Sequence, residues 1–172
     1  MHKKTRSILI IIFLSGFVVL MTRMIFLDIM VVQGYSMEQY LVPGQLLFVN
    51  RLSYGLVEPF NNSYIYRWRN PIKGEIVVFK SPLDGYITVK RCIAVAGDPM
   101  QIQGGYLFIE NEKIPLKKYQ EEKLQEHTKV PENSIFVLGD NVAQSIDSRE
   151  LGFITLNLII GQVMFVSNQK EN

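Results

Sequence analysis

The sequence contains very little cysteine and histidine, and this shortage restricts the chemistry open to it. Its 172 residues include one cysteine, Cys92, and two histidines, His2 and His127. A single cysteine excludes an internal disulfide. One cysteine and two such distant histidines cannot form a zinc site without several carboxylates. We interpret Cys92 as a small buried hydrophobic residue rather than a nucleophile.

An excess of charge of one sign is also absent. The formal net charge is +2, and the basic residues are scattered except at the N-terminus. Nucleic-acid binding proteins show a basic face with interleaved aromatic residues, so we expect no nucleic-acid partner. The length suffices for one modest domain and a membrane segment, but not for two large domains.

One long apolar run is present, at residues 7–27 (SILIIIFLSGFVVLMTRMIFL). It has about the 20 residues needed to span hydrocarbon, and Arg23 lies near its far end. Lys3, Lys4 and Arg6 precede it, so the positive-inside rule places residues 1–6 in the cytoplasm. No Ala-x-Ala-like site follows, which favours an uncleaved transmembrane anchor over a cleaved signal peptide. The lack of polar periodicity argues against a buried core helix.

The remaining residues, 28–172, predict a mostly β, antiparallel domain on the outer side of the membrane. Short apolar and β-branched runs alternate with glycine, proline and asparagine, a pattern typical of short strands joined by turns. Asn111 is the expected turn of one hairpin. The expected strands are 29–32, 46–50, 75–79, 86–96, 107–110, 113–114, 134–138 and 162–166.

Two segments are expected to be inserted loops. Residues 53–73 hold five aromatic residues among polar ones. They predict either an ordinary loop whose rings fold partly into the core, or a contact with the membrane interface, where amphipathic rings accumulate. Residues 117–131 are highly charged without apolar periodicity, which predicts a solvated loop or a short helix.

Ser36, in the stretch GYSMEQYL directly after the apolar run, is the candidate nucleophile. A serine nucleophile needs a base. His2 lies in the predicted cytoplasmic tail, and no motif surrounds His127, so a Ser-His-Asp triad is unlikely to be present and a Ser-Lys pair remains. Lys90 is the best candidate because it lies inside a predicted strand.

The surroundings of Lys90 predict burial. Period-two alternation places Thr88, Cys92, Ala94 and Ala96 on its face of the strand. Burial against small apolar residues destabilises an ammonium and yields the neutral amine that a base requires. The alternative is a lysine on an edge strand that guards against aggregation.

A third stretch, residues 139–152 (GDNVAQSIDSRELG), gathers polar side chains between apolar strands. Asp147 and Arg149 are two residues apart and are suited to an ion pair. Ser145 is suited to donate a hydrogen bond to a neutral amine. The alternative is a plain polar turn.

Together, these stretches resemble the bacterial type I signal peptidase (leader peptidase) family of Ser-Lys dyad serine proteases. Residues 34–38 (GYSME) resemble its Gly-x-Ser-Met box, residues 89–98 (VKRCIAVAGD) its lysine box, and residues 74–79 (GEIVVF) its Gly-Asp-Ile-Val-Val-Phe strand. Gly139, Asp140 and Asn141, followed by Ser145, Asp147, Ser148, Arg149 and Gly152, resemble its last box.

The resemblance implies the roles of the candidate residues. Ser36 would be the nucleophile and Lys90 the general base, with no cofactor or metal. Ser145 would orient the lysine, while Asp147 and Arg149 would brace the site. The Ser36 backbone N–H would contribute to the oxyanion hole. Val32 and Val89 would line shallow pockets for small substrate side chains, and Met37 would be a core or membrane-facing side chain.

The resemblance also implies the partners and the location. The substrates would be signal peptides of exported preproteins, and the chain would contact membrane lipid near the export channel. It would be a single-pass protein of the cytoplasmic (inner) membrane. The alternatives are a dedicated processing peptidase for one partner, a catalytically inactive anchored binding module, and a mitochondrial relative.

The sequence departs from the family pattern at three places. Gln39 and Tyr40 replace the usual Pro-Thr after the serine box. Val142, Ala143 and Gln144 replace a common Arg-x-Asn. Gly34 stands where some members carry a hydroxyl donor to the oxyanion. These departures bear on substrate range and efficiency, because Ser36 and Lys90 are both present.

Overall fold

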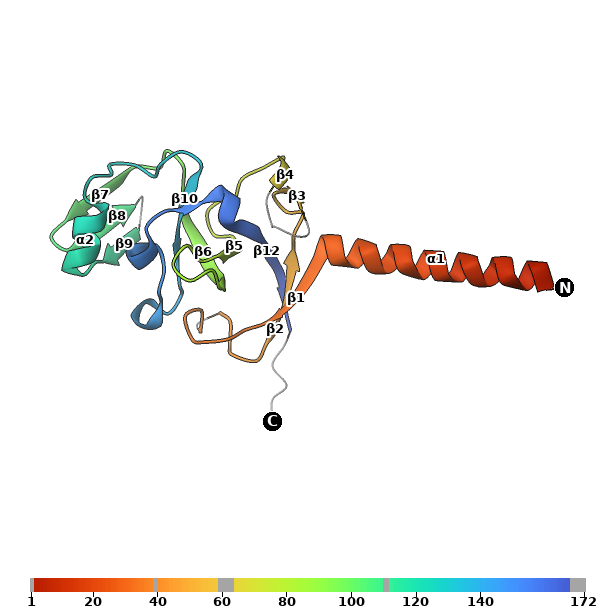
Figure 1. Ribbon diagram of the computed structural model, residues 1–172. Coiled ribbons are helices and arrows are strands. Elements are labelled where there is room, and N and C mark those ends of the chain that lie inside the picture. Colours follow the sequence, from red (N-terminus) through yellow and green to blue (C-terminus); the bar gives the residue numbers. More distant parts are fainter. Residues whose placement is uncertain (1, 39, 59–63, 110–111, 168–172) are drawn as a thin grey trace.

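A long helix projects from a β domain in the computed structural model (Figure 1). The structure describes all residues except 1, 39, 59–63, 110–111 and 168–172, and the side chains of 2–4, 18, 20–25 and 57 are also outside the description. Helix α1 spans His2–Phe26. From Ile8 to Leu14 every side chain is apolar and at least half exposed, so apolar groups occupy every face of that stretch. Within the described part of the chain, no helix meets the length and hydropathy criteria for a membrane span.

The helix ends one residue before the end of the predicted anchor, because Leu27 already belongs to the first strand. The main sheet has seven strands in the order β1-β2-β12-β5-β6-β10-β11. All pairings between these described strands are antiparallel, which confirms the predicted mostly β, antiparallel domain. The seven strands are β1 (Leu27–Val31), β2 (Leu46–Asn50), β5 (Ile76–Lys80), β6 (Ile87–Val95), β10 (Ser134–Leu138), β11 (Ile154–Thr155) and β12 (Ile159–Val166).

A smaller unit lies at the end of the domain remote from α1 (Figure 1). It contains a three-stranded sheet and a short helix, whose charged sequence predicted a loop or short helix. Its apolar side chains join those of β6 and β10 in one hydrophobic cluster. Its elements are β7 (Met100–Gln103), β8 (Tyr106–Ile109), β9 (Glu112–Pro115) and α2 (Lys118–Leu124). The predicted turn at Asn111 lies outside the described residues.

The aromatic segment is not the irregular loop that the sequence predicted. It contains a two-stranded antiparallel hairpin of β3 (Gly55–Val57) and β4 (Tyr64–Arg67). Tyr54, directly before β3, is fully buried and packs in the cluster beneath β5, β6 and β10. This hairpin was not predicted, because its strands are short and its apolar residues do not alternate regularly.

Strand β6 carries the predicted alternation. Lys90, Cys92 and Ala94 are buried on one face, and the residues between them are partly exposed. β6 is also an interior strand, paired with β5 through Ile87–Arg91 and with β10 from Arg91 onward. Lys90 is only 3% exposed. A side chain this deeply buried does not face solvent, which argues against the alternative of a lysine that guards an exposed strand edge.

Candidate active site

Ser36 lies in the loop that joins β1 to β2, and two buried side chains fix this loop. Met37 and Leu41 are 3% and 1% exposed, in the cluster under β2 and β5. The Leu41 N–H donates to the Met37 carbonyl over 2.6 Å. Met37 is thus the core side chain that the sequence allowed. Because the residues that follow it are anchored in the core, Ser36 has a defined position.

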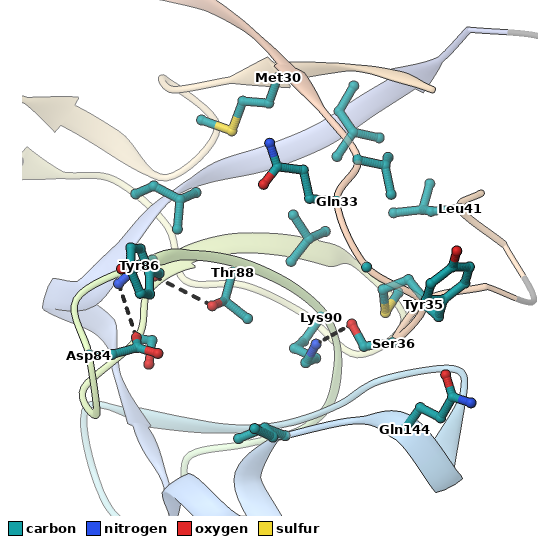
Figure 2. Close-up of a pocket in the computed structure, with 18 of the residues that line it drawn as sticks. Met30, Gln33, Tyr35, Ser36, Leu41, Asp84, Tyr86, Thr88, Lys90 and Gln144 are labelled. Atoms are coloured by element: carbon teal, nitrogen blue, oxygen red, sulfur yellow. Dashed lines mark hydrogen bonds between the residues drawn. The ribbon is translucent and has the colours of Figure 1, made fainter. Parts of the chain in front are cut away.

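Ser36 and Lys90 meet across the cleft between this loop and β6. Ser36 Oγ and Lys90 Nζ form a hydrogen bond of 2.6 Å (Figure 2). The two residues are 54 positions apart in the sequence. A hydroxyl hydrogen-bonded to an amine is the arrangement in which the amine can take the proton of an attacking oxygen, provided that the amine is neutral.

The surroundings of Lys90 favour the neutral amine. Burial lowers the pKa of the Lys90 ammonium from its usual value to about 8, while the negative charges of Asp147 and Asp140 act in the opposite direction. Desolvation is the largest of these effects, because burial deprives the charged form of the amine of its hydration. A large fraction of Lys90 is therefore neutral in mildly alkaline solution.

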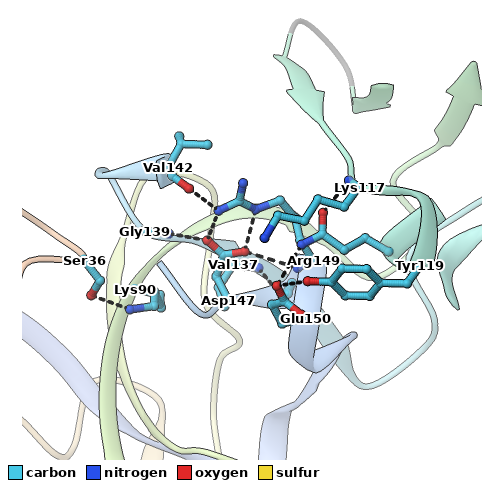
Figure 3. Close-up of polar contacts among 12 residues, drawn as sticks. Ser36, Lys90, Lys117, Tyr119, Val137, Gly139, Val142, Asp147, Arg149 and Glu150 are labelled. Atoms are coloured by element: carbon cyan, nitrogen blue, oxygen red, sulfur yellow. Dashed lines mark hydrogen bonds and ion pairs between the residues drawn. The ribbon is translucent and has the colours of Figure 1, made fainter. Parts of the chain in front are cut away.

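After β10, Asp147 and Arg149 form a buried ion pair behind the lysine, which we call the polar bracket (Figure 3). Arg149 makes a two-point contact with Asp147, Nε to Oδ1 at 2.9 Å and Nη2 to Oδ2 at 3.0 Å. Asp147 also accepts from the N–H of Gly139, and Arg149 Nη2 donates to the Val142 carbonyl. Asp147 caps the short helix α3 (Ser148–Leu151). The ion pair that the spacing predicted is present and joins both ends of the loop.

Ser145 lies inside this bracket with an unusual environment. Its Oγ is buried and has no hydrogen-bond partner in the described part of the chain. A Cβ placed on Gly139 would lie 2.2 Å from this oxygen and 2.5 Å from the Ser36 carbonyl oxygen. Ser145 is therefore close to the serine loop, and the hydrogen bond expected from it to the lysine is not formed in this geometry.

Sequence reasoning did not identify a second set of contacts around the serine loop. The Arg91 guanidinium donates to both carboxylate oxygens of Asp140, at 2.9 and 2.7 Å. The Asn141 N–H donates to the Ser36 carbonyl over 3.0 Å. The Tyr40 ring lies 5.3 Å from the Arg91 guanidinium. The only signal in the sequence was the position of these residues inside the serine, lysine and last stretches.

Helix α2 contacts Glu150, the residue directly after Arg149, and this contact was also not predicted. Glu150, in α3, accepts hydrogen bonds at one carboxylate oxygen from the Tyr119 hydroxyl and from Gln120 Nε2. Lys123 Nζ donates to the Glu150 carbonyl. Gln120 is 3% exposed, so the helix is docked rather than loosely apposed. The charged segment thus supports the loop that carries Ser145.

A groove of about 650 Å³ opens at Ser36 and Lys90 (Figure 2). Val32 and Val89, the predicted pocket residues, both line it. Its other apolar walls include Met30, Leu47 and Ile87. Most of the residues that line the groove are apolar, so it suits an extended peptide with small apolar side chains better than a charged molecule.

Other candidate chemistry finds no support in the geometry. His127 is exposed and packs its ring edge-on against Phe153, with centroids 4.8 Å apart. Cys92 is fully buried, and burial raises the pKa of its thiol to about 12, as expected of a core residue. Among the described residues, no three His, Cys, Asp or Glu side chains are grouped so as to hold a metal ion.

Comparison with known proteins gives an independent line of information. The family model described as "Signal peptidase, peptidase S26" matches residues 5–167. A signal peptidase I of Bacillus caldolyticus is 34% identical over 153 residues, which cover 78% of this chain and 76% of the relative. Signal peptidase I P of Bacillus subtilis subsp. natto is 30% identical over 149 residues, which cover 79% and 74%.

A solved structure was also found, the crystal structure of a signal peptidase I from Enterococcus faecalis V583. It is 25% identical, covers 56% of this chain and 98% of its own, and superposes with a TM-score of 0.43. The family model covers nearly the whole chain, and the curated relatives cover more than three quarters of it. The chain therefore belongs to the signal peptidase family, peptidase S26.

Proposed function

We propose that this signal peptidase cleaves preproteins with Ser36 as its nucleophile and Lys90 as its general base. Its function is the removal of signal peptides, and it is a serine peptidase. The observation that carries the assignment of residues is the 2.6 Å contact between Ser36 Oγ and an amine that is 3% exposed and has a lowered pKa. Among the described residues, Lys90 is the buried lysine, and its amine contacts the Ser36 hydroxyl inside the groove.

The reaction then follows from the positions of these groups. The neutral Lys90 amine takes the proton of Ser36 Oγ as this oxygen attacks the carbonyl carbon of the scissile bond. The Ser36 N–H donates to the developing oxyanion. The Lys90 ammonium next gives its proton to the leaving amine, and an acyl-enzyme remains on Ser36. Lys90 then deprotonates a water molecule that hydrolyses this ester and restores the enzyme.

Ser145, Asp147 and Arg149 support Lys90 in this scheme. A buried hydroxyl without a partner is costly unless it is used. A small rotation of the lysine during the reaction would let Ser145 Oγ bond to its amine and hold it toward the substrate. The Asp147–Arg149 pair keeps the Ser145 loop in place through Gly139 and Val142. These three residues are positioning residues rather than reacting groups.

The substrate is an extended peptide segment in the groove. On the side of β6 that faces β10, the segment Ile87–Lys90 has no partner strand among the described residues, so its backbone can pair with a substrate. Val32 and Val89 leave only shallow space beside Ser36, which suits alanine at the cleavage site. Side chains alternate along an extended peptide, so the third residue before the cleavage site faces the same wall.

We assign α1 to the membrane anchor and the β domain to the outer side of the cytoplasmic membrane. An isolated helix that is apolar on every face needs a nonaqueous environment, and the basic residues Lys3, Lys4 and Arg6 favour a cytoplasmic N-terminus. Ser36 follows the end of α1 by ten residues. This short spacing supports a position of the nucleophile near the membrane surface, where a translocated preprotein would emerge from the export channel.

The test is cleavage of a preprotein with an Ala-x-Ala site by the full chain in detergent. We expect the wild type to cut after the final alanine, and Ser36→Ala and Lys90→Ala to be inert while retaining the wild-type circular dichroism spectrum. Lys80→Ala is the matched control, because Lys80 is an exposed lysine at the end of β5, and it should cut like the wild type. Equal cleavage by all four proteins would contradict the dyad, and binding without cleavage by the wild type would support an inactive binding module.

A further inference from the structure

A second hollow, of about 560 Å³, adjoins the groove that holds Ser36 and Lys90. It is lined by residues of the β5–β6 turn, of α2 and of the stretch that ends with α3. These residues are Pro82, Leu83, Lys123, Ile146, Glu150 and Leu151. Leu83, Ile146 and Leu151 line the groove as well, so they form an apolar ridge between the two spaces. We call these three residues the ridge and the second space the side hollow.

The ridge begins next to the catalytic pair and is held at both ends. Ile146 directly follows Ser145, whose buried Oγ lies beside the serine loop. Leu151 packs against the core cluster beneath β5, β6 and β10. Leu83 lies in the β5–β6 turn, where its N–H donates to Ser81 Oγ over 3.3 Å. Ile146 and Leu83 are 59% and 73% exposed, so a peptide in the groove can pass a side chain across them.

The side of the hollow away from the ridge is polar, because α2 docks on Glu150 there (Figure 3). Lys123 Nζ donates to the Glu150 carbonyl, which uses one of the three N–H donors of the ammonium. The Glu150 carboxylate accepts from the Tyr119 hydroxyl and from Gln120, so its oxygens are engaged with α2. An occupant of the side hollow would therefore meet apolar groups first and a positively charged donor beyond them.

The two faces of the sheet decide which substrate side chain points to the ridge. Side chains alternate along β6, so Val89 lies on one face and Cys92 on the other. A peptide paired with the free edge of β6 follows the same alternation. Its last residue before the cut and the third residue before the cut share the Val89 face. The penultimate residue of the signal peptide therefore points to the Cys92 face, whose core cluster contacts Leu151 of the ridge.

We propose that the side hollow receives the side chain of the penultimate residue of the signal peptide, and that Lys123 favours a long side chain ending in an oxygen. This proposal rests on the proposed peptidase function and adds a determinant of specificity to the shallow space at Val32 and Val89. Glutamate and glutamine fit the description. Their methylene groups would lie against the ridge, and their terminal oxygen would accept from Lys123. A penultimate lysine would bring a like charge to the same place, which is unfavourable.

A carboxylate in the groove acts in the opposite direction to Lys123. Asp84 lines the groove but not the side hollow, and its Oδ1 accepts from the Tyr86 N–H over 3.0 Å. A penultimate side chain that stayed in the groove would be exposed to this negative charge, and lysine would be favoured there. The sign of the charge preference therefore reports on which side of the ridge the side chain lies.

The test compares four preproteins that differ only at the penultimate residue of the signal peptide, which is alanine, glutamine, glutamate or lysine. The full chain in non-ionic detergent cuts each of them, and kcat/KM is measured at low ionic strength because salt screens an exposed ammonium. We expect kcat/KM for glutamate to exceed that for lysine at least about tenfold, the effect of one hydrogen bond to a charged group. Glutamine and alanine should lie between them, and 1 M salt should reduce the preference for glutamate.

Two variants assign the preference to the side hollow. Lys123→Met keeps a long side chain without the charge, so the ratio of kcat/KM for glutamate to that for lysine should fall to near one. The ratio is the readout because loss of the Lys123–Glu150 contact alone would slow all substrates alike. Ile146→Trp adds bulk at the ridge and should lower the same ratio. Lys118→Met is the matched control, since Lys118 is an exposed lysine of α2 that lines neither space, and its ratio should match the wild type.

The outcomes separate this inference from the proposed function. If the wild type cuts the four preproteins equally well, or cuts the lysine substrate best, the penultimate side chain does not enter the side hollow and the function stands. If the preference for glutamate survives in Lys123→Met, another group supplies it and the inference is wrong. If the wild type cuts none of the four, the proposed function fails and this inference fails with it.

Discussion

Gly139 lies directly against the main chain of Ser36. A Cβ at position 139 would be 2.5 Å from the Ser36 carbonyl oxygen and 2.2 Å from Ser145 Oγ. The N–H of Asn141, two residues after Gly139, donates to the same Ser36 carbonyl over 3.0 Å. The glycine therefore allows three segments of the chain to meet: the serine loop, the end of β10 and the Ser145 loop. None of these contacts involves the reacting atoms, yet together they set where Ser36 stands.

The first prediction concerns this close approach. Gly139→Ala should lower kcat/KM about 100-fold, because a displacement of roughly 1 Å of a reacting group has an effect of that size. Over-packing of this kind costs about 1–3 kcal/mol, so the protein should remain folded. Gly16→Ala is the control, since a Cβ at Gly16 meets nothing within 4 Å. If Gly139→Ala kept the wild-type kcat/KM, the close contact between residue 139 and the Ser36 backbone would not be needed for catalysis.

The second prediction concerns pH. Only the neutral Lys90 amine can take the Ser36 proton, and burial lowers the pKa of Lys90 to about 8. The neutral fraction grows as the pH rises through that value, so kcat/KM should rise from neutral pH and level off above it. The profile of kcat/KM reports groups of the free enzyme. A profile that is flat from pH 6 to 10, or one that falls, would contradict a lysine base.

Asp140 provides the matched variant for the pH profile. Its carboxylate raises the Lys90 pKa, in opposition to burial. Asp140→Asn removes that charge, so the rising limb should move to lower pH. Glu112→Gln is the control, because Glu112 lies exposed on β9 in the remote unit, and its profile should match that of the wild type. A limb that moves to higher pH in Asp140→Asn would mean that another group titrates.

The third prediction concerns the buried bracket. Arg149→Ala leaves the fully buried Asp147 carboxylate without its ion-pair partner. Removal of one member of a buried pair costs about 3–5 kcal/mol, so the free energy of unfolding in urea should fall by that amount. Asp28→Asn is the comparison, because the Asp28–Arg51 pair is longer, at 3.5 Å, and more exposed. Exposed pairs contribute about 0–1 kcal/mol. If the two variants lost the same free energy of unfolding, the Asp147–Arg149 pair would contribute no more to stability than an exposed pair.

The sequence predicted the mostly β domain and the pairing of Ser36 with Lys90 because local patterns encode them. Period-two alternation in β6 places Lys90 with Cys92 and Ala94 on a buried face, and the shortage of histidine makes a lysine the expected base. Strands β2 and β10 have the predicted bounds, because each is a short apolar run between turn residues. The pairing of Asp147 with Arg149 was also predictable, since the two are only two residues apart in the sequence.

The other contacts depend on parts of the chain that no local pattern relates. Arg91 and Asp140 are 49 residues apart, and their pairing follows only from the register of β6 against β10. The docking of α2 on Glu150 was hidden because α2 is charged and lacks an apolar stripe; only Gln120 and Leu124 are buried in it. The exposure of Tyr66 and Trp68 was equally hidden, since Tyr54 of the same segment lies inside the core.

The last prediction concerns substrate choice. Val89 lines the groove beside Lys90, so Val89→Ala widens the space for the residue at the cleavage site. A difference of one or two methyl groups in an apolar pocket changes kcat/KM about 10–200-fold. We compare two preproteins whose signal peptides end in alanine and in valine. We expect the preference for the alanine substrate to fall by at least about tenfold, mainly because the valine substrate is cleaved faster. The measurement is kcat/KM for the two preproteins, which differ only at that residue.

Val163→Ala is the control for this experiment. Val163 packs against the same hydrophobic cluster as Val89, but it does not line the groove. The same methyl groups are lost from the same cluster, so a general loosening of the core would alter both variants alike. A change of preference in Val89→Ala alone shows that this side chain measures the substrate residue. A change in both, or in neither, would place the alanine preference elsewhere in the groove.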